Sequence, residues 1–183
     1  MFRNTKSSYG VITIILHWVM AVTIISLFGL GLYMVELTYY DAWYIGSLDL
    51  HKSIGMTLFI VFIVRVVWRI VNVVPKSADE TASKMEVKAA HYAHIILYIL
   101  MGLLMVSGYL ISTADGRGIE VFDLINIPAL GVSMTNQEDI AGNIHEILAW
   151  TLILMSALHA LAALKHHFLN KNNTLKRMLT IKG

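Results

Sequence analysis

The sequence contains no cysteine, and only 14% of its 183 residues are charged. Without cysteine the chain forms no disulfide, and it offers no thiolate to an iron–sulfur cluster or a haem. Covalent haem attachment through a C-x-x-C-H motif is excluded for the same reason. A soluble domain carries about a quarter charged residues, so the low charge argues against an ordinary soluble protein.

Apolar residues make up 57% of the sequence and gather in long runs with few charges. Four runs, at about 10–34, 50–73, 89–113 and 142–167, each reach the roughly 20 apolar residues that cross a bilayer. We therefore expect an all-α integral membrane protein, a four-helix bundle that forms a single domain over residues 1–183. The first run is longer than the apolar region of a signal peptide and no A-x-A-like site follows it, so we expect a retained anchor.

Basic residues gather at one side of the four runs. That side holds Arg3, Lys6, Arg65, Arg69, Lys76, Lys84, Lys88, Lys165, Lys171, Lys176, Arg177 and Lys182, whereas only Lys52 and Arg117 fall on the other. The positive-inside rule then predicts that both termini are cytoplasmic. On the outer side, the aromatic loop at about 35–49 is typical of a membrane interface, and we expect residues 118–130 to form a short interfacial helix.

Eight histidines occur in the sequence, mostly near the ends of the spans. Neutral imidazole is the usual noncovalent haem ligand when cysteine is absent. His145 and His159 are fourteen positions apart on the last run. On a helix, fourteen steps return to within about 40° of the starting direction and rise by about 21 Å. One helix thus points two imidazoles the same way, one near each membrane surface.

A six-coordinate haem needs two imidazoles at the same depth on facing helices. His51 matches His145 within about a turn near the outer surface, while His17 and His159 lie about 10 Å and about 13 Å from the inner one. The pattern predicts an outer haem between His51 and His145 and an inner haem between His17 and His159. The depth of His94 also suits the inner haem, and a histidine inside a span also serves as a helix–helix hydrogen bond.

Cations and small residues accompany these histidines. Arg65 and Arg69 near the inner surface would neutralise haem propionates or simply snorkel, and Lys52 is their outer equivalent. His94 would contact a propionate if it is not a ligand, and His91 would contact one or mark the interface.

A polar cluster ends the last span and would bind a quinone headgroup or only mark the interface: Lys165, His166 and His167. Small residues would permit close packing around a flat cofactor or ordinary helix contacts: Gly29, Gly31, Gly55, Gly102 and Gly108.

Four stretches cover all the spans: LHW at His17, HKSIGMTLFIVFIVRVVWR from His51, AHYAHIILY, and HEILAW with LHALAALKHHFLNKNNTLKRM. In these stretches the chain resembles the bacterial cytochrome b561 family of four-helix, dihaem inner-membrane proteins. The resemblance implies two b haems held by His17, His51, His145 and His159, in a multi-pass protein of the bacterial inner membrane. Its partners would be membrane lipid and a quinone, with no nucleic acid.

Two functions follow from the resemblance. In the branch that the chain looks most like, superoxide outside the cell gives an electron to the outer haem, which passes it through the inner haem to ubiquinone. The alternative is an electron-transfer subunit that links the quinone pool to a periplasmic redox protein. The outer side is acidic, which suits a basic protein partner and repels superoxide unless Lys52 and Arg117 form a local funnel. A weaker alternative is a structural subunit whose histidines bind no haem.

Overall fold

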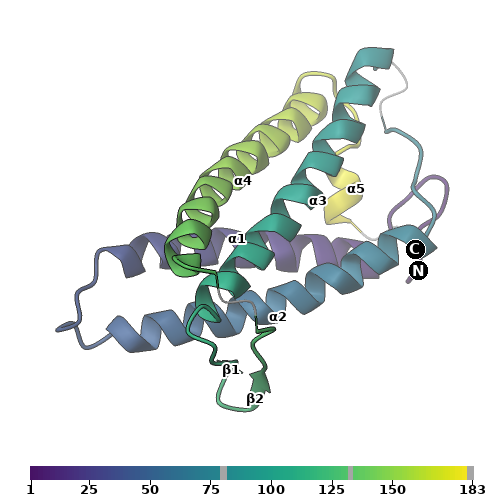
Figure 1. Ribbon diagram of the computed structural model, residues 1–183. Coiled ribbons are helices and arrows are strands. Elements are labelled where there is room, and N and C mark those ends of the chain that lie inside the picture. The colour runs from purple at the N-terminus through teal and green to yellow at the C-terminus, as the bar shows by residue number, and fades with distance from the viewer. Residues whose placement is uncertain (79–81, 132–133, 181–183) are drawn as a thin grey trace.

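A computed structural model describes residues 1–78, 82–131 and 134–180. Four helices in it are long and apolar enough to cross a membrane: α1 (Val11–Val35), α2 (Tyr44–Val71), α3 (Lys84–Ser112) and α4 (Gln137–Phe168). Two short strands, β1 (Ile119–Val121) and β2 (Ile125–Ile127), connect α3 to α4, and a short helix, α5 (Lys176–Leu179), follows α4. The predicted four-span helical bundle is confirmed (Figure 1).

Three of the four helices begin several residues before the apolar runs that predicted them. In α3 the Ser83 side chain accepts a hydrogen bond from the Glu86 backbone N–H, while the Glu86 carboxylate accepts one from the Ser83 N–H. This capping box starts the helix in polar sequence. Apolar runs locate only the part of a helix that meets hydrocarbon, so the polar first turns of α2, α3 and α4 lie outside them.

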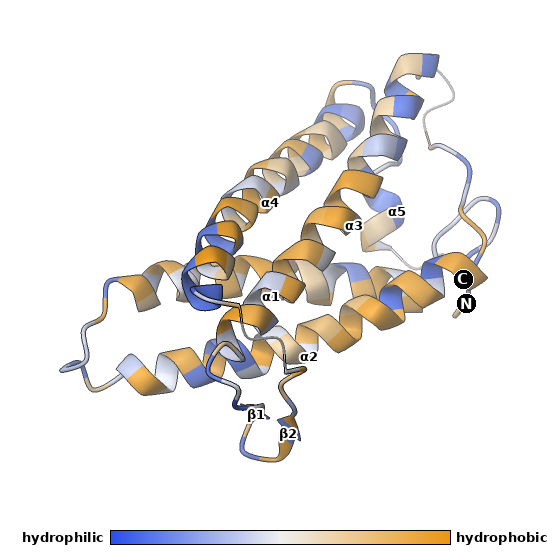
Figure 2. Ribbon diagram, in the orientation of Figure 1, coloured by the Kyte–Doolittle hydropathy of each residue, from blue (hydrophilic) through white to orange (hydrophobic). Residues whose placement is uncertain are grey.

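The four helices form two antiparallel hairpins, α1 with α2 and α3 with α4, which cross one another (Figure 1). Their common core is small and draws on every helix: Met20, Leu27, Leu58, Met101 and Leu152. Most other apolar side chains point outward, and apolar residues lie all round the helices (Figure 2). A helix that is apolar on all sides without being buried in protein is suited to lipid.

The segment expected to be a short interfacial helix, residues 118–130, is instead a β-hairpin, so that prediction was wrong. Ile119 pairs with Ile127 and Val121 with Ile125. β-branched residues favour strands, and positive φ angles at Phe122 and Asp123 turn the chain where a helix would need negative ones. The hairpin is fixed to α2 because the buried Ser53 hydroxyl accepts from the Phe122 N–H (3.0 Å) and donates to the Glu120 carbonyl (3.4 Å).

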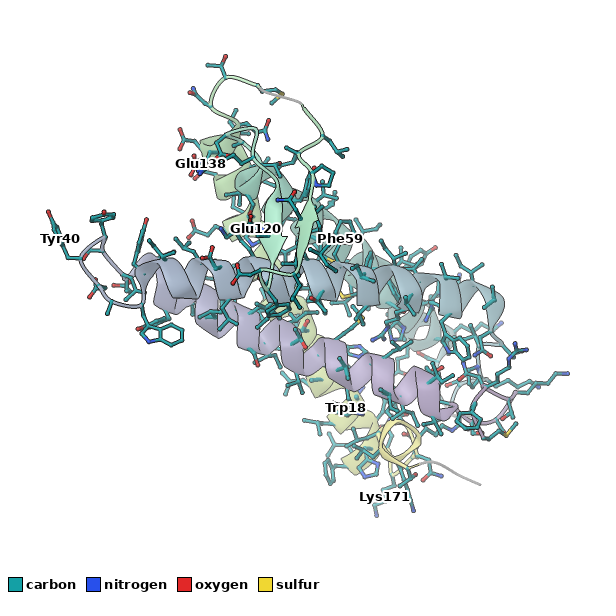
Figure 3. All side chains as sticks on the ribbon, turned by 90° about the horizontal axis from the view of Figure 1, so that it is seen from below. Trp18, Tyr40, Phe59, Glu120, Glu138 and Lys171 are labelled. Carbon is teal, nitrogen blue, oxygen red and sulfur yellow. The ribbon has the colours of Figure 1, made fainter. Side chains whose placement is uncertain are left out.

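The two ends of the bundle differ in charge. We call the end formed by residues 1–10, 72–78 and 169–180 the basic end; both chain termini lie there (Figure 1). The opposite end, formed by residues 36–43, 113–131 and 134–136 together with the adjoining helix turns, is the acidic end. Figure 3 shows Glu120 and Glu138 at the acidic end and Lys171 far from both. Which end faces the cytoplasm remains a prediction from this asymmetry.

Candidate functional site

At the acidic end, α2 and α4 bring His51 and His145 together. Their ring centroids are 6.4 Å apart and the ring planes are inclined by 70°. Two imidazoles on opposite sides of one metal ion, each bonded at about 2 Å, have centroids separated by roughly 6 Å. The spacing therefore fits two axial ligands of one iron.

At the basic end, three histidines from three helices meet. The ring centroids of His17 and His159 are 6.4 Å apart, the same spacing as at the acidic end. His94 lies closer to His159, at 5.1 Å between centroids. That distance is shorter than the roughly 6 Å expected across a metal ion. The geometry thus fits His17 better than His94 as the residue opposite His159.

Hydrogen bonds at the acidic end fix the tautomer and the ring orientation of His145. Its Nδ1 lies 3.1 Å from the Leu104 carbonyl oxygen and 3.1 Å from the Ser107 hydroxyl, which itself donates to the Leu104 carbonyl. Because a carbonyl only accepts, Nδ1 carries the proton and Nε2 keeps its lone pair. A carbonyl on Nδ1–H is the usual support of a metal-bound histidine, and it orients the ring.

Small residues from every helix surround the acidic-end pair. A Cβ atom on Gly31 would lie 3.6 Å from His51 Cε1, and one on Gly108 only 3.1 Å from His145 Cε1. At Gly55 and Gly142, each about one turn from a histidine, a Cβ atom would meet nothing within 4 Å. The buried Nδ1 of His51 has no hydrogen-bond partner among the described residues, which is unusual for a buried polar atom. Open space, glycines and an unsatisfied nitrogen all fit a flat cofactor at this pair.

The Arg65 guanidinium makes most of the hydrogen bonds at the basic-end site. Arg65 donates to His17 Nδ1 (3.1 Å), to the Tyr98 hydroxyl (3.1 Å) and to the Leu16 carbonyl (3.2 Å). The Arg65 and Arg69 guanidinium carbons lie 5.7 Å and 5.3 Å from the Tyr98 ring centroid. Since a guanidinium only donates, His17 accepts at Nδ1 and carries its proton on Nε2. Metal binding through Nε2 therefore requires that proton to leave and Arg65 to withdraw from Nδ1.

The two cations of the acidic end are both paired. Lys52 Nζ lies 2.8 Å from an Asp49 carboxylate oxygen, and the Arg117 guanidinium lies 2.6 Å from Asp115. Hydrogen bonds from the Arg117 backbone N–H and guanidinium hold the pKa of Asp115 below its usual value, so the pair is charged on both sides at neutral pH. The expected funnel of Lys52 and Arg117 thus has each of its charges offset by a carboxylate.

The three residues of the polar cluster at the end of α4 each contact a different partner. Lys165 pairs with Glu86 of α3 at 3.2 Å, and His167 Nδ1 donates to the Asn172 carbonyl at 2.9 Å. His166 Nδ1 lies 3.1 Å from Asn170 Nδ2. The structure therefore places Lys165, His166 and His167 at the basic end but turns them to different partners. His91 is exposed there, beside Tyr92.

Sequence reasoning missed Tyr98, Leu104 and Ser107. Tyr98 follows His94 by four residues, and this helical spacing was a usable signal for a shared face. Ser107 and Leu104 gave no signal, because their contact with His145 depends on how α3 packs against α4.

The family model described as prokaryotic cytochrome b561 matches residues 8–181. Cytochrome b561 homolog 2 of Escherichia coli strain K12 is 45% identical over 97% of this chain and 94% of its own length. The probable superoxide oxidase CybB of Yersinia pestis is 29% identical over 93% of this chain and 95% of its own. Cytochrome b561 homolog 1 of Escherichia coli is 33% identical over about half of each chain.

Proposed function

We propose, from the premise that this chain belongs to the prokaryotic cytochrome b561 family, that each of its two histidine pairs holds one haem b. Members of the family are transmembrane haem b electron-transfer proteins, and the chain is a multi-pass bacterial membrane protein. The observation that carries the proposal is the common 6.4 Å spacing of His51 with His145 and of His17 with His159. Bound haem supplies a one-electron carrier that needs no open coordination site.

The proposed location is the bacterial inner membrane, with the basic end in the cytoplasm. Positive-inside bias supports this orientation, because twelve of the 14 Lys and Arg residues fall on the side of the termini. His51 and His145 then form the outer site, and His17 and His159 the inner one. Lipid surrounds the outward-facing apolar side chains of all four helices.

The surroundings of the two pairs favour electron transfer from outside to inside. The Arg65 and Arg69 charges near the inner pair stabilise the less positive, reduced state of a carrier held there. At the outer pair, donation from His145 Nδ1–H to the Leu104 carbonyl makes the imidazole a stronger electron donor, which favours the oxidised state. The inner site therefore has the higher reduction potential.

The donor and acceptor that we propose are superoxide on the outer side and ubiquinone on the inner side. The similarity to a probable superoxide oxidase supports the first. The basic end supports the second, because Lys165, His166 and His167 lie there, and a quinone headgroup that exchanges with their present partners would be protonated by them. The activity would be that of a superoxide:ubiquinone oxidoreductase.

A second candidate function is an electron-transfer subunit that connects the quinone pool with a periplasmic redox protein. The observation that favours it is the acidic end, where Lys52 and Arg117 are each paired with a carboxylate. Such a surface repels an anionic radical and attracts a basic protein. The same two haems would serve this function.

A superoxide pulse separates the two candidates. The full-length, oxidised protein would be mixed with superoxide in lipid nanodiscs while its visible spectrum is followed, with superoxide dismutase as the control. Rapid appearance of reduced b-haem bands, abolished by the dismutase, supports superoxide oxidation. Haems that ignore superoxide but are reduced by quinol support the second candidate. A protein without b-haem bands contradicts both.

A further inference from the structure

A cavity of about 410 Å³ opens at the basic end, and none of the paired histidines lines it. The segment before α1 and the tail after α4 form its walls. Its lining includes four hydroxyl side chains, an amide and two cations: Thr5, Ser7, Ser8, Thr180, Asn173, Lys176 and Arg177. No carboxylate is among the described residues that line it. Hydroxyls, amides and cations together are groups that donate hydrogen bonds to an anion.

The walls of this cavity are tied together by hydrogen bonds between distant segments. The Asn4 side-chain amide donates to the Val73 carbonyl (2.9 Å), and the Lys76 N–H donates to the Lys6 carbonyl (3.0 Å). Arg177 Nη1 donates to the Lys76 carbonyl at 2.7 Å. The N-terminal segment, the end of α2 and the C-terminal tail thus hold one another in place.

Two further contacts fix the walls against the helices. Trp18 of α1 donates its indole N–H to the Met178 carbonyl at 2.7 Å, and Figure 3 shows Trp18 beside the tail. Gly10 allows the N-terminal segment to fold back tightly, because a Cβ atom there would collide with the Phe2 carbonyl oxygen. The cavity is therefore a feature of the folded termini rather than a gap between loose ends.

The cations of the cavity retain most of their donors. Among the described residues, no carboxylate forms an ion pair with Lys176 or Arg177. Arg177 uses one of its five N–H groups on the Lys76 carbonyl. The Thr5 hydroxyl lies within 2.9 Å of the Ser8 hydroxyl, which brings two hydroxyls to one wall. A phosphate group, with several acceptor oxygens and a negative charge, matches this set of donors.

We propose that the cavity between the N-terminal segment and the C-terminal tail binds a phosphate group through Lys176, Arg177 and the hydroxyls of residues 5–8. The phosphate belongs either to an anionic lipid headgroup or to a soluble phosphate compound. Basic segments next to a membrane span attract anionic lipids, so the headgroup is the source that the location favours. The inference does not depend on the haem ligands.

The test compares two lysines of the same tail. Lys176→Gln removes a cation that lines the cavity, and Lys171→Gln removes an exposed cation that does not. Lys176→Arg restores the charge. Full-length variants in neutral detergent are titrated with phosphatidylglycerol or phosphatidylcholine of the same acyl chains, and bound lipid is counted by native mass spectrometry. Circular dichroism spectra of the variants and the wild type are compared to confirm that the variants are folded. In a second arm, inorganic phosphate alone is titrated by calorimetry.

We expect Lys176→Gln to weaken phosphatidylglycerol binding about fivefold, the effect of one lysine near an anionic group. Lys171→Gln and Lys176→Arg should bind as the wild type does, and phosphatidylcholine should bind more weakly to all. Binding of inorganic phosphate that Lys176→Gln abolishes would assign the site to a soluble phosphate compound instead. Equal weakening by both Gln variants, or no binding in either arm, would overturn the proposal.

Discussion

The two histidine pairs have the same spacing but opposite polar surroundings. At the acidic end, the carbonyl of Leu104 accepts from His145 Nδ1, which leaves the lone pair of Nε2 free. At the basic end, the Arg65 guanidinium donates to His17 Nδ1, which places the proton on Nε2. Under the proposed haem assignment, the pair at the acidic end would accept iron as it stands, whereas the pair at the basic end would have to rearrange. Spacing alone defines where a cofactor fits, whereas the hydrogen bonds decide how it is held and tuned.

The contrast also supports the proposed direction of electron transfer through the bundle. A carbonyl acceptor at the outer site and two guanidinium groups at the inner site act oppositely on a one-electron carrier. Under the proposed haem assignment, both effects would lower the potential at the His51–His145 pair relative to that at the His17–His159 pair. All four helices build the asymmetry. Arg65 of α2 contacts His17 of α1 and Tyr98 of α3, whereas Leu104 of α3 contacts His145 of α4.

The largest effects should come from removing one histidine of the helix that serves both pairs. If each pair holds its own haem, as proposed, His145→Ala should lose only the outer haem and His159→Ala only the inner one. Haem content should fall from two to one per chain in each variant, measured by the pyridine haemochrome assay. Loss of both haems, or of neither, would refute the pairing.

A smaller effect is expected from crowding the outer pair. Gly108→Ala places a methyl group 3.1 Å from His145 Cε1, and overpacking of this kind costs about 1–3 kcal/mol. Outer-haem affinity should fall by about tenfold or more in haem titrations. Gly46→Ala is the matched control, since its methyl group would make only an ordinary contact, 3.7 Å from Trp43 Cε3. Equal affinities in the two variants would contradict the proposed cradle.

The inner cation should tune a potential rather than decide whether haem binds. Arg65→Gln removes a positive charge that favours the reduced state, so the inner-haem potential should fall. A tenfold change in the redox equilibrium corresponds to about 59 mV for one electron, and we expect a shift of that order. Spectroelectrochemical titration measures it, with the outer haem as internal reference. A rise in potential, or an equal shift of both haems, would go against the account.

The smallest effect should come from the support of the outer ligand. Ser107→Ala removes one of the two groups near His145 Nδ1 but leaves the Leu104 carbonyl. Loss of a complete supporting contact lowers metal affinity by about 10–100-fold, so we expect less than about tenfold here. Haem titration of the variant measures this, and an effect as large as that of His145→Ala would show that Ser107 is essential to the site.

Much of this architecture is predictable from sequence because membrane helices and their ligands obey simple periodicities. The four spans follow from apolar runs, and the meeting of His51 with His145 follows from matched depth. The hairpin at Ile119–Ile127 was missed because its short apolar segment fits a helix or strands, and the positive φ at Phe122 and Asp123 leaves no sequence signal.

Other features depend on how the helices pack. The depth of His94 suited the inner site, and the structure does bring it within 5.1 Å of His159. Only the distances show that His17 has the spacing expected of a second ligand. Likewise, Arg65 could snorkel or face the site by sequence alone, and its contact with His17 depends on how α1 packs against α2.

A redox titration of the purified wild-type protein beside His159→Ala tests the central claim most directly. We predict two one-electron transitions from two b haems in the wild type, and the loss of the higher-potential transition in His159→Ala. Loss of the lower-potential transition in that variant, or one haem per chain in the wild type, would contradict the assignment of two unlike haem sites.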